Sequence, residues 1–246
     1  MGTVNSGMPA EADAPGRAGM SEGRLLLAFT MSLDGFVAGP DVGVEQPMGR
    51  GGERLHEWMF TDSPDRGEDP ELAREVSALI GAVILGRRTF DVGLGHWGDT
   101  PYPVPSFVLT HERREPLAME SAAFTFVNDG IEAALHQARR AANGRAVVVM
   151  GAQTAQQYLR AGFVDDLILQ VAPVLLGAGT RLFDHIGREP TELRRERIVG
   201  SPFVTHLKFS LANHSPNDGA PGGAPGALRR PEGVRSVVDL REEPAS

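Results

Sequence analysis

The stretch from Val147 to Phe183 reads VVVMGAQTAQQYLRAGFVDDLILQVAPVLLGAGTRLF, and it decides the fold class. It opens with a short β-branched apolar run, which is typical of a fully buried strand, and this run ends at Gly151. We expect a helix next, with Thr154 as its N-cap and Gly162 just beyond its C-terminus. A second strand is expected over 167–171. The stretch therefore predicts a strand–glycine–helix–strand unit.

This unit offers an anion site at the start of the expected helix. Backbone amides in the first turn of a helix lack intrahelical acceptors and lie at the positive end of the helix dipole. Gly151 would let a phosphate approach the main chain, and Gln153 and Thr154 could add side-chain hydrogen bonds. The alternative is a tight strand-to-helix turn that binds no ligand, which is common for isolated motifs of this kind.

The length and composition indicate one α/β domain between two tails. The chain has 246 residues, of which 41% are hydrophobic, and that is enough for a large core. Residues 1–22 and 213–246 are rich in small and polar residues without hydrophobic periodicity, and the second tail is rich in Gly and Pro. We expect both tails to be disordered and the domain to occupy 23–212.

The composition also disfavours several classes of function. The chain has no cysteine, which excludes thiolate nucleophiles and Cys-ligated metals. His56 and His96 have no Glu or His at metal-binding spacing, so we expect no metal. A formal net charge of −8 argues against general nucleic-acid binding. With no secretory signal and no apolar run of about 20 residues, we expect a cytoplasmic protein without membrane contact.

A second candidate anion site follows the apolar run AVIL at 82–85. The next four residues, GRRT at 86–89, place two arginines and a threonine at the carboxyl end of an expected strand. Guanidinium groups suit bidentate phosphate binding, although one arginine could instead pair with Asp91 on the surface. The motif G-x-G-x-x-G at 93–98 does not follow a strand directly, so we expect a surface loop there and not a dinucleotide fingerprint.

The first strand is expected over RLLLAFT at 24–30, and Asp34-Gly35 is a turn dipeptide that predicts a hairpin into the short run 36–38. Asp34 would then be a carboxylate at the carboxyl end of a central strand, where open α/β sheets bind ligands. The alternative is that Asp34 only builds the turn.

A long Gly- and Pro-rich loop at 39–69 is interrupted by a short helix expected at 54–60. Loops of this length in a compact domain are typically lids or binding loops. Trp58 in the short helix is a candidate substrate contact, and the alternative is a core position. Asp69 is expected to be the N-cap of a helix that ends at Gly81.

The remaining elements complete the fold class. Strands are expected at 106–110 and 124–127, a helix at 129–142, and a hairpin of two strands at 192–199 and 204–211. Alternating strands and helices followed by antiparallel strands predict an α/β fold with a mixed, mostly parallel central sheet.

Four segments together resemble the dihydrofolate reductase-like superfamily, in the branch that shares the C-terminal reductase domain of the bifunctional riboflavin-biosynthesis deaminase/reductase. They are RLLLAFTMSLDGFVA at 24–38, VILGRRTF at 83–90, SFVLT at 106–110, and residues 149–183. The resemblance implies a three-layer fold in which helices flank the sheet, NADPH as cofactor, a small-molecule substrate, and a homodimer.

The resemblance also implies site residues by position. Those that would hold the cofactor are Ala28, Met31, Gly86, Arg87, Arg88, Thr89, Leu109, Thr110, Gly151, Ala152, Gln153 and Thr154. Ser32 and Asp34 would face the substrate, and Asp34 is the candidate catalytic residue, either anchoring the substrate or relaying a proton.

Two departures from the family bear on the substrate. Folate-reducing members pair the pterin with an acidic residue in the helix after the first loop, and Glu53 and Glu57 give no clear match here. The deaminase domain of the bifunctional protein carries a Cys-rich zinc motif, which a chain without cysteine lacks. The sequence thus predicts an NADPH-dependent reductase that resembles 5-amino-6-(5-phosphoribosylamino)uracil reductase. Dihydrofolate reduction and a non-catalytic NADPH- or nucleotide-binding module are the alternatives.

Overall fold

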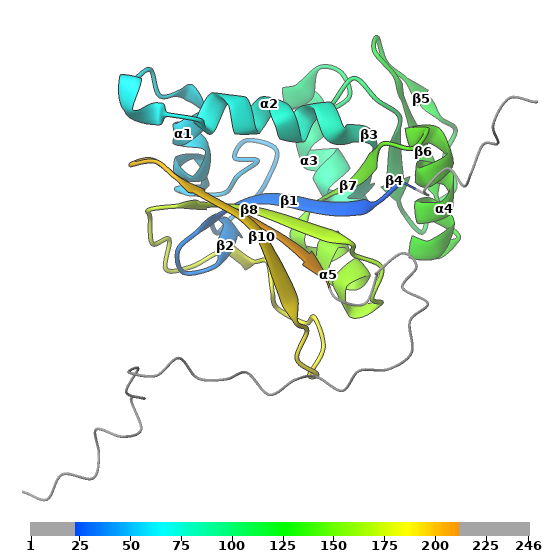
Figure 1. Ribbon diagram of the computed structural model, residues 1–246. Helices are drawn as coiled ribbons and strands as arrows, with labels where there is room; N and C mark the ends of the chain where they lie inside the picture. The colour runs from blue at the N-terminus through cyan, green and yellow to red at the C-terminus, as the bar shows by residue number, and fades with distance from the viewer. Residues whose placement is uncertain (1–22, 212–246) are drawn as a thin grey trace, which may run out of the picture. The chain divides into compact units, whose positions relative to one another are not determined.

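The computed structural model describes residues 23–211, and the two expected tails lie outside this range (Figure 1). The described residues form a nine-stranded sheet with helices on both faces and a separate two-stranded sheet. The strands of the large sheet are β1 (Leu25–Ser32), β3 (Ile80–Gly86), β4 (Ser106–Leu109), β5 (Leu117–Ala118), β6 (Ala123–Val127), β7 (Ala146–Met150), β8 (Asp166–Ala172), β10 (Leu193–Gly200) and β11 (Thr205–Leu211). The small sheet pairs β2 (Phe36–Ala38) with β9 (Thr180–Arg181).

Seven helical segments connect these strands. They are η1 (Gly52–His56), α1 (Glu57–Phe60), η2 (Pro64–Arg66), α2 (Asp69–Leu79), α3 (Arg87–Trp97), α4 (Gly130–Ala142) and α5 (Ala152–Arg160). The short helix expected at 54–60 is confirmed as η1 followed directly by α1.

The large sheet is mixed, as expected. Its strand order is β10-β11-β8-β1-β7-β3-β4-β6-β5, and the neighbouring pairs from β8 through β6 are all parallel. Strands β11 and β10 pair antiparallel at one edge and β5 at the other. The predicted mostly parallel sheet with antiparallel C-terminal strands is therefore confirmed.

Helices cover both faces because the central strands are apolar on both sides. In β3, Ala82 and Ile84 belong to the core beneath α4 and α5, whereas Val83 and Leu85 belong to the core beneath α3. All four side chains are fully buried, which explains why the run AVIL shows no alternation. Figure 1 shows α2 and α3 on one side of the sheet and α5 on the other, so the fold has three layers.

Two loop predictions are wrong. Asp34-Gly35 does form a turn, with Gly35 at a φ of 88°, but β2 pairs with β9 and not with β1, so there is no hairpin. The motif at 93–98 is not a surface loop, because α3 continues through it and ends at Gly98 in the left-handed conformation. A glycine is needed at position 93 of the helix, because the Trp97 ring packs so closely over it that a β-carbon has no room.

The expected N-cap role of Asp69 is also wrong. Helix α2 begins at Asp69 with Pro70 in its first turn, but Glu68 occupies the N-cap position. The Asp69 side chain is only 1% exposed and bonds to Ser201 and His206, which come from the opposite end of the chain. Tertiary partners have replaced the local capping bond.

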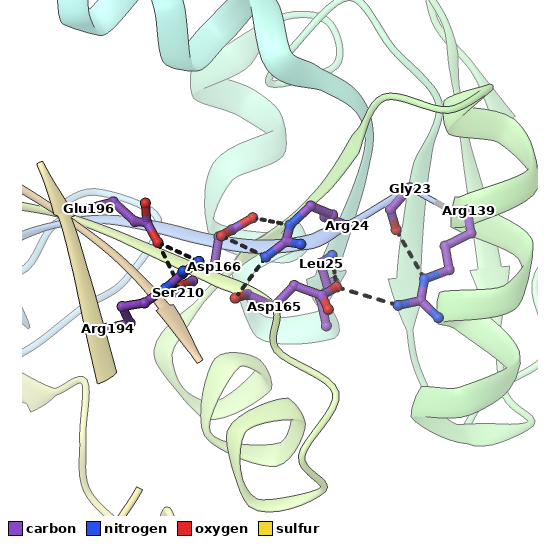
Figure 2. Close-up of polar contacts among 9 residues, drawn as sticks. All are labelled: Gly23, Arg24, Leu25, Arg139, Asp165, Asp166, Arg194, Glu196 and Ser210. Carbon is purple, nitrogen blue, oxygen red and sulfur yellow. Dashed lines mark hydrogen bonds and ion pairs between the residues drawn. The ribbon is translucent and has the colours of Figure 1, made fainter. Parts of the chain in front are cut away.

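A polar network ties the first strand to the rest of the domain at the amino end of the sheet (Figure 2). Arg24 donates to both carboxylate oxygens of Asp166 in β8. The buried Asp165 accepts a hydrogen bond from the Leu25 amide at 2.7 Å and lies 3.6 Å from the guanidinium of Arg139 in α4. The network therefore joins β1, β8 and α4 at the edge of the sheet from which β1 starts.

Candidate functional site

The carboxyl ends of β3, β4 and β7 lie in one row, beside the middle of β1. Gly86 of β3 pairs with Leu109 of β4, Leu85 pairs with Met150 of β7, and Leu27 of β1 pairs with Val149. The residues that follow these pairs include Ala28, Thr89, Thr110 and Gly151. The register thus brings the four predicted cofactor-binding segments to one edge of the sheet, where α/β folds bind ligands.

The N-termini of α3 and α5 lie side by side at this edge. A β-carbon on Gly151 would come within 2.3 Å of the Thr89 hydroxyl oxygen, and one on Gly86 within 2.6 Å of the Thr154 hydroxyl oxygen. Each glycine therefore faces a threonine at the start of the other helix. Two sets of N-terminal amides converge on one place, which favours an anion.

Gly151, and not Thr154, is the N-cap of α5. Gly151 has φ 89° and ψ 127°, a conformation that is strained for any residue with a side chain. Thr154 is the third residue of the helix and is buried against Gly86. Ala152 is also buried, whereas Gln153 is exposed and its carbonyl accepts a hydrogen bond from Gln157.

The two candidate arginines differ in their partners. Arg87 forms ion pairs at 2.8 Å with Asp91 and with Glu112, so the surface pairing considered as an alternative is present for this residue. Arg88 is exposed and donates to the Val42 carbonyl at 3.2 Å, and among residues 23–211 it has no carboxylate partner. Of the two, Arg88 is better placed to receive an added anion.

Asp34 is held as an anion by the loop that follows β8. Its two carboxylate oxygens accept hydrogen bonds from the amides of Leu176 at 3.1 Å and Gly177 at 2.8 Å. A hydrogen bond from the Ser32 hydroxyl, together with these amides, lowers the pKa of Asp34 from its ordinary value of 3.8 to about 2. Because Asp34 is ionised near neutral pH and both of its carboxylate oxygens accept hydrogen bonds, it suits anchoring the substrate better than relaying a proton.

The other predicted residues of β1 face different ways. Ala28 packs with the core beneath α3, whereas Met31 packs with the core beneath α5. Ser32 is fully buried and accepts a hydrogen bond from the Phe36 amide, so its side chain stabilises the turn. Leu109 and Thr110 are half-buried at the end of β4.

A buried polar cluster under α1 was not predicted from the sequence. The His206 ring nitrogen Nε2 lies 3.1 Å from Asp69, and the His206 ring meets Trp58 edge-on with centroids 5.2 Å apart. Trp58 is 4% exposed, so its ring is buried in this cluster. The alternation in β11 could have indicated that His206 lies on the inner face. The sequence around Asp69 is that of a helix cap, so it gave no sign that Asp69 is the partner of His206.

Within residues 23–211, no helix is long and apolar enough to cross a membrane. The same part of the chain brings no three His, Asp or Glu side chains together in a way that could hold a metal ion.

Comparisons with known proteins agree with this architecture. Residues 24–209 match the family described as the RibD C-terminal domain. The uncharacterized protein YwjB of Bacillus subtilis is 25% identical over 176 residues, which cover 70% of this chain and 89% of YwjB.

Two solved structures share the fold. A riboflavin biosynthesis protein described as putative, from Shewanella sp. PV-4, has a TM-score of 0.57 at 20% identity and covers 76% of this chain and 98% of its own. The deaminase/5-amino-6-(5-phosphoribosylamino)uracil reductase of Thermotoga maritima has a TM-score of 0.55 at 13% identity. That match covers 78% of this chain and 57% of the Thermotoga chain.

Proposed function

The chain belongs to the RibD C-terminal domain family, and from this membership we propose that it is an NADPH-dependent reductase. Its substrate would be a small heterocycle or a ribosylaminopyrimidine, as in 5-amino-6-(5-phosphoribosylamino)uracil reduction. The observation that carries the proposal is the convergence of the α3 and α5 N-termini at the carboxyl ends of β3 and β7. Dihydrofolate reduction has no comparable support, because Glu53 and Glu57 are exposed.

The residues at this convergence fit the phosphates of a dinucleotide. Gly86 and Gly151 let the two helix N-termini approach each other closely, because the hydroxyl groups of Thr154 and Thr89 lie where the β-carbons of the two glycines would be. These residues would hold the pyrophosphate, and Arg88 would bind the 2′-phosphate that distinguishes NADPH from NADH. When bound, the nicotinamide would supply the hydride.

The protein itself would orient the reactants and exclude water. Asp34 fixes the loop after β8 through the Leu176 and Gly177 amides, and Arg181 reinforces this by donating to the Asp34 carbonyl at 2.7 Å. The segment between β2 and α2 covers the sheet beside β1, where η1 contacts both β1 and β8. It would act as the lid over the reacting groups.

A titration with NADPH and, separately, NADH tests the cofactor half of the proposal. Trp58 and Trp97, the two tryptophans of the chain, would report binding through energy transfer to the reduced nicotinamide. We expect saturable, NADPH-preferring binding, followed by NADPH oxidation with 5-amino-6-(5-phosphoribosylamino)uracil. Binding without oxidation of NADPH against that compound or dihydrofolate would favour the non-catalytic module, and no binding of either nucleotide would refute the proposal. The homodimer is a further part of the proposal, and sedimentation of the purified protein tests it.

A further inference from the structure

Three polar side chains form a row across the sheet next to the proposed cofactor site. Thr30 of β1 pairs with Gln170 of β8, and Gln170 pairs with His206 of β11. Directly paired residues point to the same face of a sheet, so the three side chains lie together. Each is at most 9% exposed. We call Thr30, Gln170 and His206 the polar row.

The segment that covers this face, Gly52–Arg66, leaves polar atoms without partners. Within residues 23–211, the buried side-chain nitrogens with no hydrogen bond are His56 Nδ1, Trp58 Nε1 and Arg66 Nε. All three lie in the covering segment. Buried polar groups in native proteins are almost always paired, so the Trp58 indole N–H is a donor that is available to a further molecule.

A chain of contacts holds Trp58 in place over the polar row. The Ser201 hydroxyl donates to Asp69 Oδ2 at 2.7 Å, and Asp69 Oδ1 lies 3.1 Å from His206 Nε2. Asp69 thus contacts Ser201 and His206 through its two carboxylate oxygens. The His206 ring in turn meets the Trp58 indole at an interplanar angle of 87°. Asp69 therefore orients the Trp58 ring through its contact with His206.

The position of the polar row relates it to the reaction. Thr30 lies two residues beyond Ala28 on the same face of β1, which is about 7 Å along the strand. Ala28 is one of the residues that the family resemblance implies for holding the cofactor. A molecule that contacts both Ala28 and Trp58 would lie where the substrate of a reductase must lie.

We infer that Trp58 Nε1 donates a hydrogen bond to a ring carbonyl oxygen of a planar heterocyclic substrate, and that Asp69 and His206 are positioning residues for this donor. The inference rests on the proposed function, and it adds the residue that recognises the substrate ring. An indole N–H is a donor only, which selects a carbonyl, while the Gln170 amide and the Thr30 hydroxyl can each serve a ring N–H or a second carbonyl. Because Trp58 is buried, the covering segment opens to admit the ring and closes over it.

The decisive variant is Trp58→Phe, which keeps an aromatic ring and removes the N–H. With 5-amino-6-(5-phosphoribosylamino)uracil as the probe and NADP⁺ present to prevent turnover, we expect the dissociation constant measured by calorimetry to rise about tenfold. The NADPH dissociation constant should not change. Trp97→Phe is the matched control, since it removes the other indole of the chain, and it should leave binding of the probe unchanged.

Asp69→Asn tests the positioning role. In a Trp97→Phe background, Trp58 is the only tryptophan, so its emission reports its surroundings. We expect Asp69→Asn to shift this emission to longer wavelength and to raise KM for the probe more than it lowers kcat. A purely structural role for Asp69 would lower the melting temperature and leave both readouts of the folded protein unchanged, which would overturn the positioning role.

Two results overturn the inference on Trp58. One is equal affinity of wild-type and Trp58→Phe proteins for the probe, and the other is no binding of the probe to the wild-type protein. Both results concern the probe, whereas the cofactor half of the proposed function stands or falls with the separate titration by NADPH.

Discussion

Gly151→Ala is the substitution for which the structure predicts the sharpest outcome. Gly151 has a φ of 89°, and an added β-carbon would lie 2.3 Å from the Thr89 hydroxyl oxygen. Two separate penalties therefore act at one position. The first is backbone strain, and the second is overpacking between the starts of α5 and α3.

The expected loss of stability follows from these two penalties. A residue with a side chain in a glycine-only region of φ and ψ costs about 1–3 kcal/mol, and an extra methyl group in a packed site costs about 1–3 kcal/mol. We therefore expect Gly151→Ala to lower the free energy of unfolding by about 4 kcal/mol. In a domain of this size, that corresponds to a fall of roughly 8–16 °C in Tm.

A double-mutant cycle separates the two penalties. Thr89→Ala removes the hydroxyl that the new methyl group would meet, so the double variant should recover the overpacking part, about 1–3 kcal/mol, and keep the strain. Gly86→Ala is the matched comparison, because Gly86 has a φ of −79° and its β-carbon would meet only the Thr154 hydroxyl oxygen, at 2.6 Å. Its whole loss should be recovered by Thr154→Ala.

Denaturation in urea, followed by far-UV circular dichroism, measures each corner of the cycle. The reasoning is refuted if Gly151→Ala unfolds within about 0.5 kcal/mol of the wild-type protein, which is the range of ordinary surface substitutions. It is also refuted if Thr89→Ala gives no recovery, because the two helix starts would then not be in contact.

Three further predictions concern other parts of the molecule. Arg88→Ala should weaken NADPH binding about tenfold and leave NADH binding unchanged. Because the Arg87 guanidinium already binds two carboxylates, Arg87→Ala should change the preference for NADPH over NADH less. Equal losses of affinity for both nucleotides in Arg88→Ala would place the 2′-phosphate elsewhere. Because the pKa of Asp34 is lowered to about 2, its ionised form stabilises the fold above about pH 4, and this contribution is lost as the pH falls toward 2. Melting curves of Asp34→Asn should therefore show a smaller loss over that window, and an unchanged pH profile would contradict the assignment. Asp165→Ala should lower the free energy of unfolding by about 3 kcal/mol, since it leaves the Leu25 amide and Arg139 without this carboxylate. NADPH affinity should stay unchanged, because the network of Figure 2 is structural.

The sequence predicted the strands and the glycine junctions well because both depend on local patterns. A β-branched run that ends in glycine, as at Val147 to Gly151, carries its own evidence for a buried strand followed by a tight turn. The pairing of β3 with β7 brings Gly86 and Gly151 together, and no local sequence pattern predicts which strands pair. The reciprocal fit of each glycine to a distant threonine became visible only in three dimensions.

The errors share a physical cause. Asp69 has the sequence of a helix cap, but its side chain is recruited by Ser201 and His206 from the C-terminal hairpin. The glycines at 93 and 95 suggest a loop, but α3 continues because Trp97 folds back over Gly93. In both cases a tertiary contact overrode a local preference, and residues distant in the sequence supplied that contact.

The position of β1 in the sheet has a consequence for how the domain acquires its structure. Leu25 pairs with Val147 and Leu26 with Asp166, so the first strand obtains both of its neighbours from segments far along the chain. During synthesis, this apolar strand leaves the ribosome long before either partner exists. The central sheet therefore closes late, around a strand that has to be kept from aggregating until β7 and β8 have been made.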